Sequence, residues 1–164
     1  MRCAIAGMAI LFLASAVCGD GGVKSEQRGQ FRIVVPDLAS DKGVVIFYVH
    51  DSSTFVVDNL KKREAADDLM DAAVEITERE AVWTTEPLPY GDYALVAHHD
   101  VNGDRVVNFA RILPSEPLGY SNYDQGIAAY PDFDKARVTL DTPLREVRIE
   151  AFMQGRIFRK TLKQ

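Results

Sequence analysis

The sequence has only two cysteines, Cys3 and Cys18, and both lie close to its amino terminus. The remainder of the chain therefore has no pair of cysteines that could form an internal disulfide bond. Catalysis by a thiol and zinc sites built from thiolates are excluded for the same reason. Since 47% of the residues are hydrophobic, we expect a folded domain that is stabilised by burial of apolar side chains alone.

Positive charge is also scarce, with 19 Lys and Arg against 24 Asp and Glu and a formal net charge of −5. An acidic domain has no electrostatic attraction for nucleic acid, so we expect no nucleic-acid partner. The sequence also has no phosphate-binding glycine loop and no dinucleotide-binding fingerprint. One basic run, at the carboxyl end, is either a solvated tail or a contact for an anionic surface; its residues are Arg156, Arg159, Lys160 and Lys163.

The first residues have the pattern of a secretory signal peptide. Arg2 is positively charged, the stretch from Ile5 to Val17 is almost wholly apolar, and small residues lie just before Cys18. The apolar stretch is too short for a membrane span of about 20 residues. We therefore expect residues 1–19 to be a cleaved signal peptide and the protein to be exported, to the periplasm or the cell exterior. A lipid anchor on Cys18 is the alternative, which the poor match of Ser15 and Val17 to a lipoprotein cleavage site disfavours.

Beyond a polar linker at residues 20–29, alternation of apolar and polar residues dominates the chain to residue 153, and the basic tail occupies residues 154–164. Alternating patterns and short apolar runs of β-branched and aromatic residues predict strands. The expected strands are 31–35, 43–50, 80–85, 93–99, 135–140 and 145–152. Because the run at 43–50 is continuously apolar, it predicts a strand that is covered on both faces.

A helix is expected in the segment 59–73, which is made of helix-forming residues. Its apolar side chains fall at helical spacing, and they are Ala65, Ala66, Leu69, Met70 and Ala73. Such a helix would cover the second face of the strand at 43–50. The resulting fold class is mainly β, an antiparallel β-sandwich of six or seven strands with one inserted helix.

The stretch after the strand at 93–99 concentrates oxygen-bearing side chains in one short loop. Asp100, Asn102 and Asp104 occupy the first, third and fifth positions of a calcium-loop spacing, Asn108 the ninth, and the carbonyl of Val106 would supply the seventh. Hard cations such as calcium bind six to eight oxygens, which alternate side chains of a curled loop can supply. These residues therefore form a candidate metal site, with calcium as the cofactor.

Two positions of the loop oppose that interpretation. Arg105 stands where a calcium loop has a glycine, and its charge repels a cation; Arg111 stands where a bidentate glutamate is needed. Glu116 is near enough in sequence to take the place of that glutamate in principle. Any cation bound here would be held weakly, with an affinity typical of extracellular modules.

The alternative is a structural turn without a metal ion. In that interpretation, the side chains of Asp100 and Asn102 accept hydrogen bonds from backbone N–H groups, and Gly103 takes a positive φ angle. The sequence leaves both interpretations open.

The same stretch belongs to a longer combination of motifs. The run Gly91–Asp104, G-D-Y-A-L-V-A-H-H-D-V-N-G-D, is followed by Pro114–Glu116, by G-Y-S-N at Gly119–Asn122 and by an aromatic-proline turn at Tyr130–Phe133. This combination resembles the signature of a secreted bacterial family known as domain of unknown function 2141. The resemblance covers about residues 31–152. It implies an exported β-sandwich of transthyretin-like or immunoglobulin-like type, without an established activity.

Catalytic chemistry has weaker support. His98 and His99 are adjacent, so a strand directs them to opposite faces. His99 beside Asp100 could act as a general base in a small hydrolase, with Ser121 as the nucleophile. Because no serine lies in a G-x-S-x-G context, Ser121 is better interpreted as a turn hydroxyl that bonds to nearby backbone.

Aromatic residues gather in sequence around the long segment from Phe109 to Phe133. They either form a packed cover or grip a sugar or a protein partner, and they are Tyr90, Tyr120, Tyr123, Tyr130 and Phe133. The preferred hypothesis is an exported, non-enzymatic module of the cell envelope that binds an envelope protein or a polysaccharide through the loops at 101–133. The alternatives are a small hydrolase that uses His99 and Asp100, and a purely structural envelope module.

Overall fold

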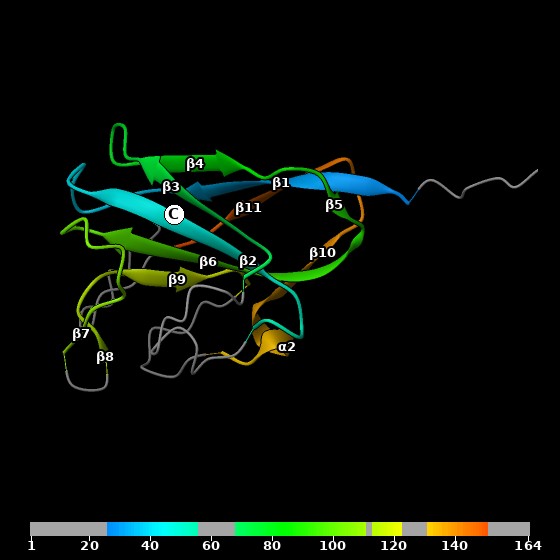
Figure 1. Cartoon of the computed structure of the whole chain (residues 1–164). Helices are drawn as coiled ribbons and strands as arrows, with labels where there is room; N and C mark the ends of the chain where they lie inside the picture. The colour runs from blue at the N-terminus through cyan, green and yellow to red at the C-terminus, as the bar shows by residue number, and fades with distance from the viewer. Residues whose placement is uncertain (1–25, 56–67, 111–112, 123–130, 151–164) are drawn as a thin grey trace, which may run out of the picture.

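The computed structural model describes residues 26–55, 68–110, 113–122 and 131–150, and the chain forms two main β-sheets (Figure 1). The first sheet has the order β11-β1-β4, and β5 also pairs with β1. Its strands are β1 (Arg28–Val35), β4 (Ala81–Thr84), β5 (Leu88–Pro89) and β11 (Leu144–Arg148). Strands β1 and β11 are parallel, whereas β4 and β5 run antiparallel to β1.

The second sheet has the order β10-β6-β2-β3, and β9 also pairs with β6; all of its pairings are antiparallel. Its strands are β2 (Val44–His50), β3 (Met70–Glu75), β6 (Gly91–Asp100), β9 (Leu118–Tyr120) and β10 (Arg137–Leu140). A small hairpin of β7 (Phe109–Ala110) and β8 (Leu113–Pro114) and a one-turn helix α2 (Phe133–Ala136) complete the described elements. Among these residues, no helix has both the length and the apolar character that a membrane span requires.

The two sheets face each other across one hydrophobic core. On β1, Phe31, Ile33 and Val35 are buried in this core, while Arg32 between them points outward and pairs with Glu146 of β11 at 2.8 Å. The inner face of β6 is likewise apolar. The mainly β fold class is confirmed, and the shared core is consistent with a sandwich because alternate residues of facing sheets supply it.

A second apolar layer covers the outer face of the second sheet. Ala94 and Val96 of β6 pack there with Leu118 and Tyr120 of β9 and with Phe55. Residues 93–100 of β6 are therefore buried on both faces, and the apolar run 93–97 is followed by three buried polar residues, His98, His99 and Asp100. Strand β2 is similarly enclosed, as its continuous apolar run predicted, because alternate residues lie in the core and the next ones pack outward.

The expected helix at 59–73 is wrong in its described part. Residues Met70 to Ala73 belong to β3, which pairs with β2 from Val49↔Met70 to Val44↔Glu75. Residues 59–67 lie outside the described residues. Met70 and Val74 pack against the core, and the alternate residues of β3 are exposed. This period of two coexists with the helical spacing, and hydrogen bonding to β2 overrides the intrinsic helix propensity.

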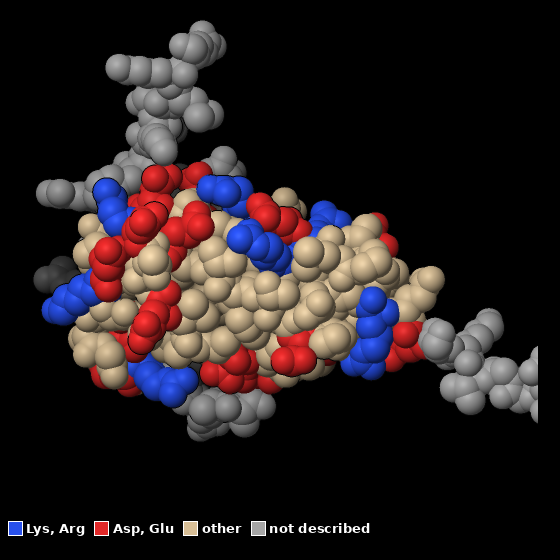
Figure 2. Space-filling model, turned by 90° about the horizontal axis from the view of Figure 1, so that it is seen from above, with Lys and Arg blue, Asp and Glu red and all other residues tan. Residues whose placement is uncertain are grey.

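Three loops lie at the same end of the molecule, on the left in Figure 1: residues 36–43, 76–80 and 101–108. In the view from above, charged side chains crowd this end and the rims, while the middle of the face over β1 and β4 is mostly uncharged (Figure 2).

The proposed signal peptide and basic tail lie outside the described residues, so those boundaries stay predictions. Strand β1 begins at Arg28, within the expected linker.

The inter-sheet core gives the first prediction. Leu95 of β6 is fully buried, so Leu95→Ala should lower the free energy of unfolding by about 2–5 kcal/mol through lost burial and a residual cavity. Leu144→Ala is the matched control because Leu144 is 55% exposed in β11, and its cost should stay within about 0.5 kcal/mol. Urea denaturation measures both, and equal costs would contradict the assigned core.

Candidate functional site

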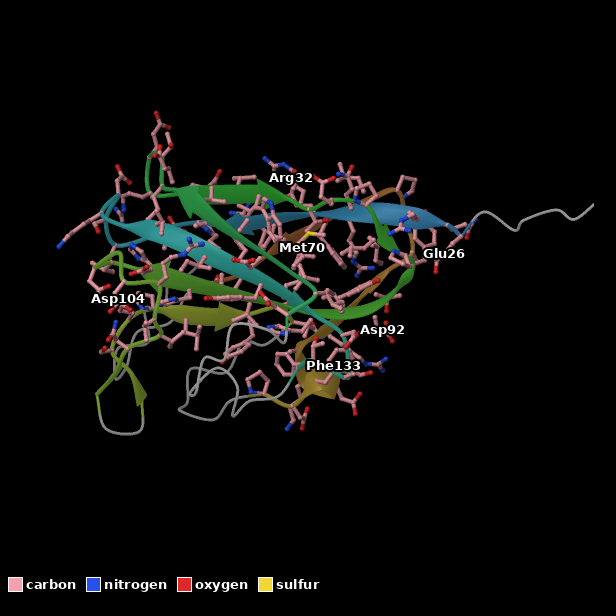
Figure 3. All side chains as sticks on the ribbon, viewed as in Figure 1. Glu26, Arg32, Met70, Asp92, Asp104 and Phe133 are labelled. Carbon is pink, nitrogen blue, oxygen red and sulfur yellow. The ribbon has the colours of Figure 1, made fainter. Side chains whose placement is uncertain are left out.

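The candidate site lies where β6 ends, on the outer face of the second sheet. Asp100 is the last residue of β6 and is paired in register with Val44, the first residue of β2. The alternation of the strand places His98 and Asp100 on this outer face, and both are fully buried. Asp104 in the following loop is exposed, and Figure 3 shows it at the left-hand end of the molecule.

Asp100 braces the loop that follows it. Its two carboxylate oxygens each accept one backbone N–H, from Gly103 to Oδ1 and from Arg105 to Oδ2, both at 2.7 Å. Gly103 and Arg105 have φ angles of +78° and +60°. Bonds of this kind satisfy a buried carboxylate and fix the backbone. They are also the bonds that the structural-turn interpretation predicts.

The same pattern is repeated one step further along the loop. The side chain of Asn102 accepts a hydrogen bond from the backbone of Asp104 at 2.9 Å, and Asp104 Oδ1 accepts one from Val106 N at 2.7 Å. The loop therefore curls so that successive side chains cap successive backbone N–H groups. Arg105 takes the bend without a glycine, and its guanidinium lies 3.9 Å from Asp71 of β3.

Glu116, which the sequence suggested only as a substitute ligand, contacts this loop directly. Its Oε1 accepts a hydrogen bond from Val101 N at 3.0 Å, and its Oε2 lies 3.0 Å from His98 Nε2 and 3.2 Å from Asn108 Nδ2. Glu116 is buried beside β9, which pairs with β6 through His98↔Leu118. The strand pairing therefore carries Glu116 to the loop.

Three carboxylates converge at this point. One oxygen each of Asp100, Asp104 and Glu116 lie within 4.8 Å of one another. Two of the four predicted ligands, Asp100 and Asp104, are thus brought together, and Glu116 joins them. Like charges at such distances repel in a partly buried setting. The hydrogen-bond donors around the three carboxylates offset this repulsion, and a bound cation would offset it further.

The other two predicted ligands, Asn102 and Asn108, present nitrogen rather than oxygen to the carboxylates. Asn102 Nδ2 and Asn108 Nδ2 each donate to Asp104 Oδ2 at 3.0 Å. Asn108 Nδ2 also lies within hydrogen-bond distance of Val106 O, at 3.0 Å, and of Glu116. For either amide oxygen to bind a cation, its amide group would have to rotate. Arg111 lies outside the described residues.

The hydrogen bonds shift the acidity of two members of the cluster. Burial acts to raise the pKa of Glu116, but the bonds from His98, Asn108 and Val101 N outweigh burial, and the net effect lowers that pKa. The pKa of Asp104 is lowered mainly by the bond from Asn108, and also by Val106 N and Asn102. Both carboxylates are therefore held in the ionised form that a cation site needs.

The residues proposed for hydrolysis are not assembled. As expected, the two histidines lie on opposite faces, and His99 Nε2 donates to Lys42 O at 2.8 Å on the inner side. Ser121 Oγ accepts from Leu95 N at 2.9 Å and donates to Ala136 O at 2.5 Å. Among the described residues, no hydrogen bond joins His99 to Asp100 or Ser121. Ser121 bonds to backbone, as expected, but to segments distant in sequence, so it fastens α2 to β6.

The aromatic residues divide between different places. Phe55 contacts the rings of Tyr120 and Phe133 with centroid distances of 6.3 and 6.1 Å, and these rings belong to the outer apolar layer. Tyr90 instead packs against the core between the sheets. Tyr123 and Tyr130 lie outside the described residues. The described parts of the segment 109–136 contain β7, β8, β9 and α2, so these parts are not a loop without secondary structure.

Comparison with known protein families identifies a family for the chain. Residues 33–148 match the model of a bacterial family described as an uncharacterized protein conserved in bacteria, DUF2141. Neither a curated protein nor a solved structure matches the chain. The match begins within β1 and ends with β11, so it contains all of β2, β6 and β9, the strands around the site.

The second prediction concerns Glu116 and acid. Because its folded-state pKa is lowered, its contribution to stability is fully present above the ordinary glutamate pKa of about 4.3 and is lost as the pH falls through the lower folded-state value. Glu116→Gln should lower the free energy of unfolding by about 1–3 kcal/mol at neutral pH and flatten its decline in acid. Urea denaturation at a series of pH values, with a chelator present, measures both effects.

Glu146→Gln is the matched control, because Glu146 also carries a hydrogen-bonded ion pair but is half exposed. Its effect should stay within about 1 kcal/mol, as is typical of surface pairs. If Glu116→Gln were as mild as this control at neutral pH, Glu116 would not be a brace of the loop.

Proposed function

The chain belongs to this family of uncharacterized bacterial proteins. On that premise we propose that the protein is an exported, non-enzymatic module of the cell envelope. The module binds a divalent cation of the calcium type at Asp100, Asp104 and Glu116. With its loops at this end ordered, it binds an envelope protein or a polysaccharide. The observation that carries the proposal is the convergence of the three carboxylates within 4.8 Å.

This spacing fits a shared calcium ion. Calcium–oxygen distances are about 2.3–2.6 Å, so two ligand oxygens on opposite sides of one ion are about 5 Å apart. Each carboxylate oxygen can accept more than one partner, so the backbone bonds of Asp100 and Glu116 leave room for coordination. The site therefore offers hard oxygen ligands of the kind that calcium prefers.

The same contacts argue for weak binding. The carboxylates already have N–H partners, and the amide nitrogens of Asn102 and Asn108 must move away from Asp104 for the ion to enter. Calcium binding must therefore break existing hydrogen bonds to Asp104, which lowers the affinity. We expect a dissociation constant of about 10⁻⁴–10⁻³ M, the range of extracellular calcium modules.

Ordering of the loops links the cation to partner binding. Asp100 and Asp104 hold residues 101–106, and Glu116 joins that loop to the segment before β9 through Val101 N. A cation shared by the three side chains would fix the exposed loop 101–106 against the buried segment that carries Glu116, and so make the surface of the loop rigid. A rigid surface binds a partner with less loss of conformational entropy.

Thermal melting with added calcium tests the cation site. A ligand that binds only the folded state stabilises it by about 1.4–2.7 kcal/mol at 10–100 times its dissociation constant, so 10 mM calcium should raise the melting temperature by several degrees. Asp104→Asn should abolish this shift. Asp134→Asn should retain it, because Asp134 is an exposed residue of α2, which lies apart from Asp104 in Figure 3.

The partner half of the proposal has its own readout. Co-sedimentation of the purified protein with cell-wall polysaccharide, and with membranes that carry envelope proteins, should increase when calcium is added and should stay at the calcium-free level in Asp104→Asn. If calcium gives no thermal shift, or an equal shift in Asp104→Asn, the cation site is refuted. Co-sedimentation that is the same with and without calcium would refute the proposal that the cation orders the loops for partner binding.

A further inference from the structure

The loop contains an asparagine–glycine pair, Asn102-Gly103, in which both residues are exposed. This dipeptide is the one most prone to spontaneous deamidation, because glycine leaves its backbone nitrogen sterically open to attack the preceding side chain. A side-chain carbon added to Gly103 would meet no atom within 4 Å. Packing therefore does not protect this peptide bond.

Hydrogen bonds nevertheless occupy both reacting groups. The attacking atom, Gly103 N, donates to Asp100 Oδ1 at 2.7 Å. The amide that would be attacked is held at both atoms by Asp104, because Asn102 Oδ1 accepts from Asp104 N at 2.9 Å and Asn102 Nδ2 donates to Asp104 Oδ2 at 3.0 Å. A carboxylate next to the N–H opposes its deprotonation, and the double hold keeps the side-chain carbonyl carbon from turning toward the nitrogen.

We infer that Asn102 is a modification site, guarded by Asp100 and Asp104, at which spontaneous deamidation proceeds only when the loop opens. This inference rests on the geometry of the loop and does not depend on the proposed cation. In the closed loop both reactants are engaged. Local opening of an exposed loop, at a free energy well below that of global unfolding, releases them.

The reaction needs only water. Hydroxide removes the proton of Gly103 N, which then bonds to Cγ of Asn102. The water formed from that hydroxide returns a proton to Nδ2, the bond from Cγ to Nδ2 breaks, and ammonia departs, so that a cyclic succinimide remains. Water then adds to one of the two ring carbonyl carbons. Cleavage at Cγ leaves an aspartyl residue at position 102, and cleavage at the main-chain carbonyl leaves an isoaspartyl residue there.

Both products change the loop irreversibly. The aspartyl product adds a negative charge next to Asp104 and loses the Nδ2 donor that Asp104 accepts. The isoaspartyl product lengthens the main chain by one carbon between positions 102 and 103. Asp100 bonds to both Gly103 N and Arg105 N, so the longer chain can no longer satisfy both bonds.

Peptide mapping by mass spectrometry after incubation at mildly alkaline pH tests the inference. Deamidation of Asn102 should be at least about tenfold slower in the native protein than in the same protein unfolded in urea at the same pH. Asp100→Asn should accelerate it in the folded state by about tenfold, which corresponds to about 1.4 kcal/mol of lost loop stabilisation. Asn102→Gln should remove the signal and identify its source.

Asp41→Asn is the matched control, because Asp41 makes the same kind of bond, accepting Arg79 N at 2.7 Å in a neighbouring loop. The rate at Asn102 should not change in this variant. If Asn102 deamidates in the native protein as fast as in urea, Asp100 and Asp104 do not protect it and the inference is overturned. The inference is equally overturned if Asp41→Asn accelerates the reaction as much as Asp100→Asn does. The comparison with urea holds even if Asp100→Asn fails to fold.

Discussion

The structure at the loop end depends on the need of two buried carboxylates, Asp100 and Glu116, for hydrogen-bond donors. An ionised carboxylate out of contact with water is costly unless N–H groups surround it. The nearest donors are backbone amides of the adjoining loop, at Val101, Gly103 and Arg105. Satisfying the charges therefore fixes the path of the chain. The conformation of the loop is a consequence of where the two carboxylates lie.

Their positions follow from the sheet. Strand β6 pairs with β2 along its carboxyl-terminal part and with β9 beside it, so its outer-facing residues are enclosed from both sides. That enclosure places Asp100 under the loop and Glu116 against His98. The outer apolar layer around Phe55 and Tyr120 closes the same face. The apolar packing thus keeps the buried part of the cluster in place, and Asn102 and Asp104 are its exposed members.

Much of this architecture could be predicted from periodicity. The alternation at Phe31–Val35 and the apolar run at 43–50 predicted β1 and β2, because side chains alternate between faces regardless of distant contacts. The prediction of a helix over the segment from Met70 was wrong because its apolar residues fit both the helical period and the strand period of two. Only the pairing with β2 decides between them. Glu116 could not be assigned from spacing, since the pairing of β9 with β6 brings it to the loop. The orientation of the Asn102 and Asn108 amides likewise depends on where the carboxylates converge, which no sequence pattern records.

The claim that Asp100, Asp104 and Glu116 share one cation is tested most directly by a crystal structure of the protein grown with saturating calcium. Anomalous scattering locates the ion independently of how its ligands are interpreted. The account predicts a peak about 2.3–2.6 Å from an oxygen of each of these three side chains. No peak there, with Asn102 and Asn108 still donating to Asp104, would show that the cluster is a brace for the loop and not a cation site.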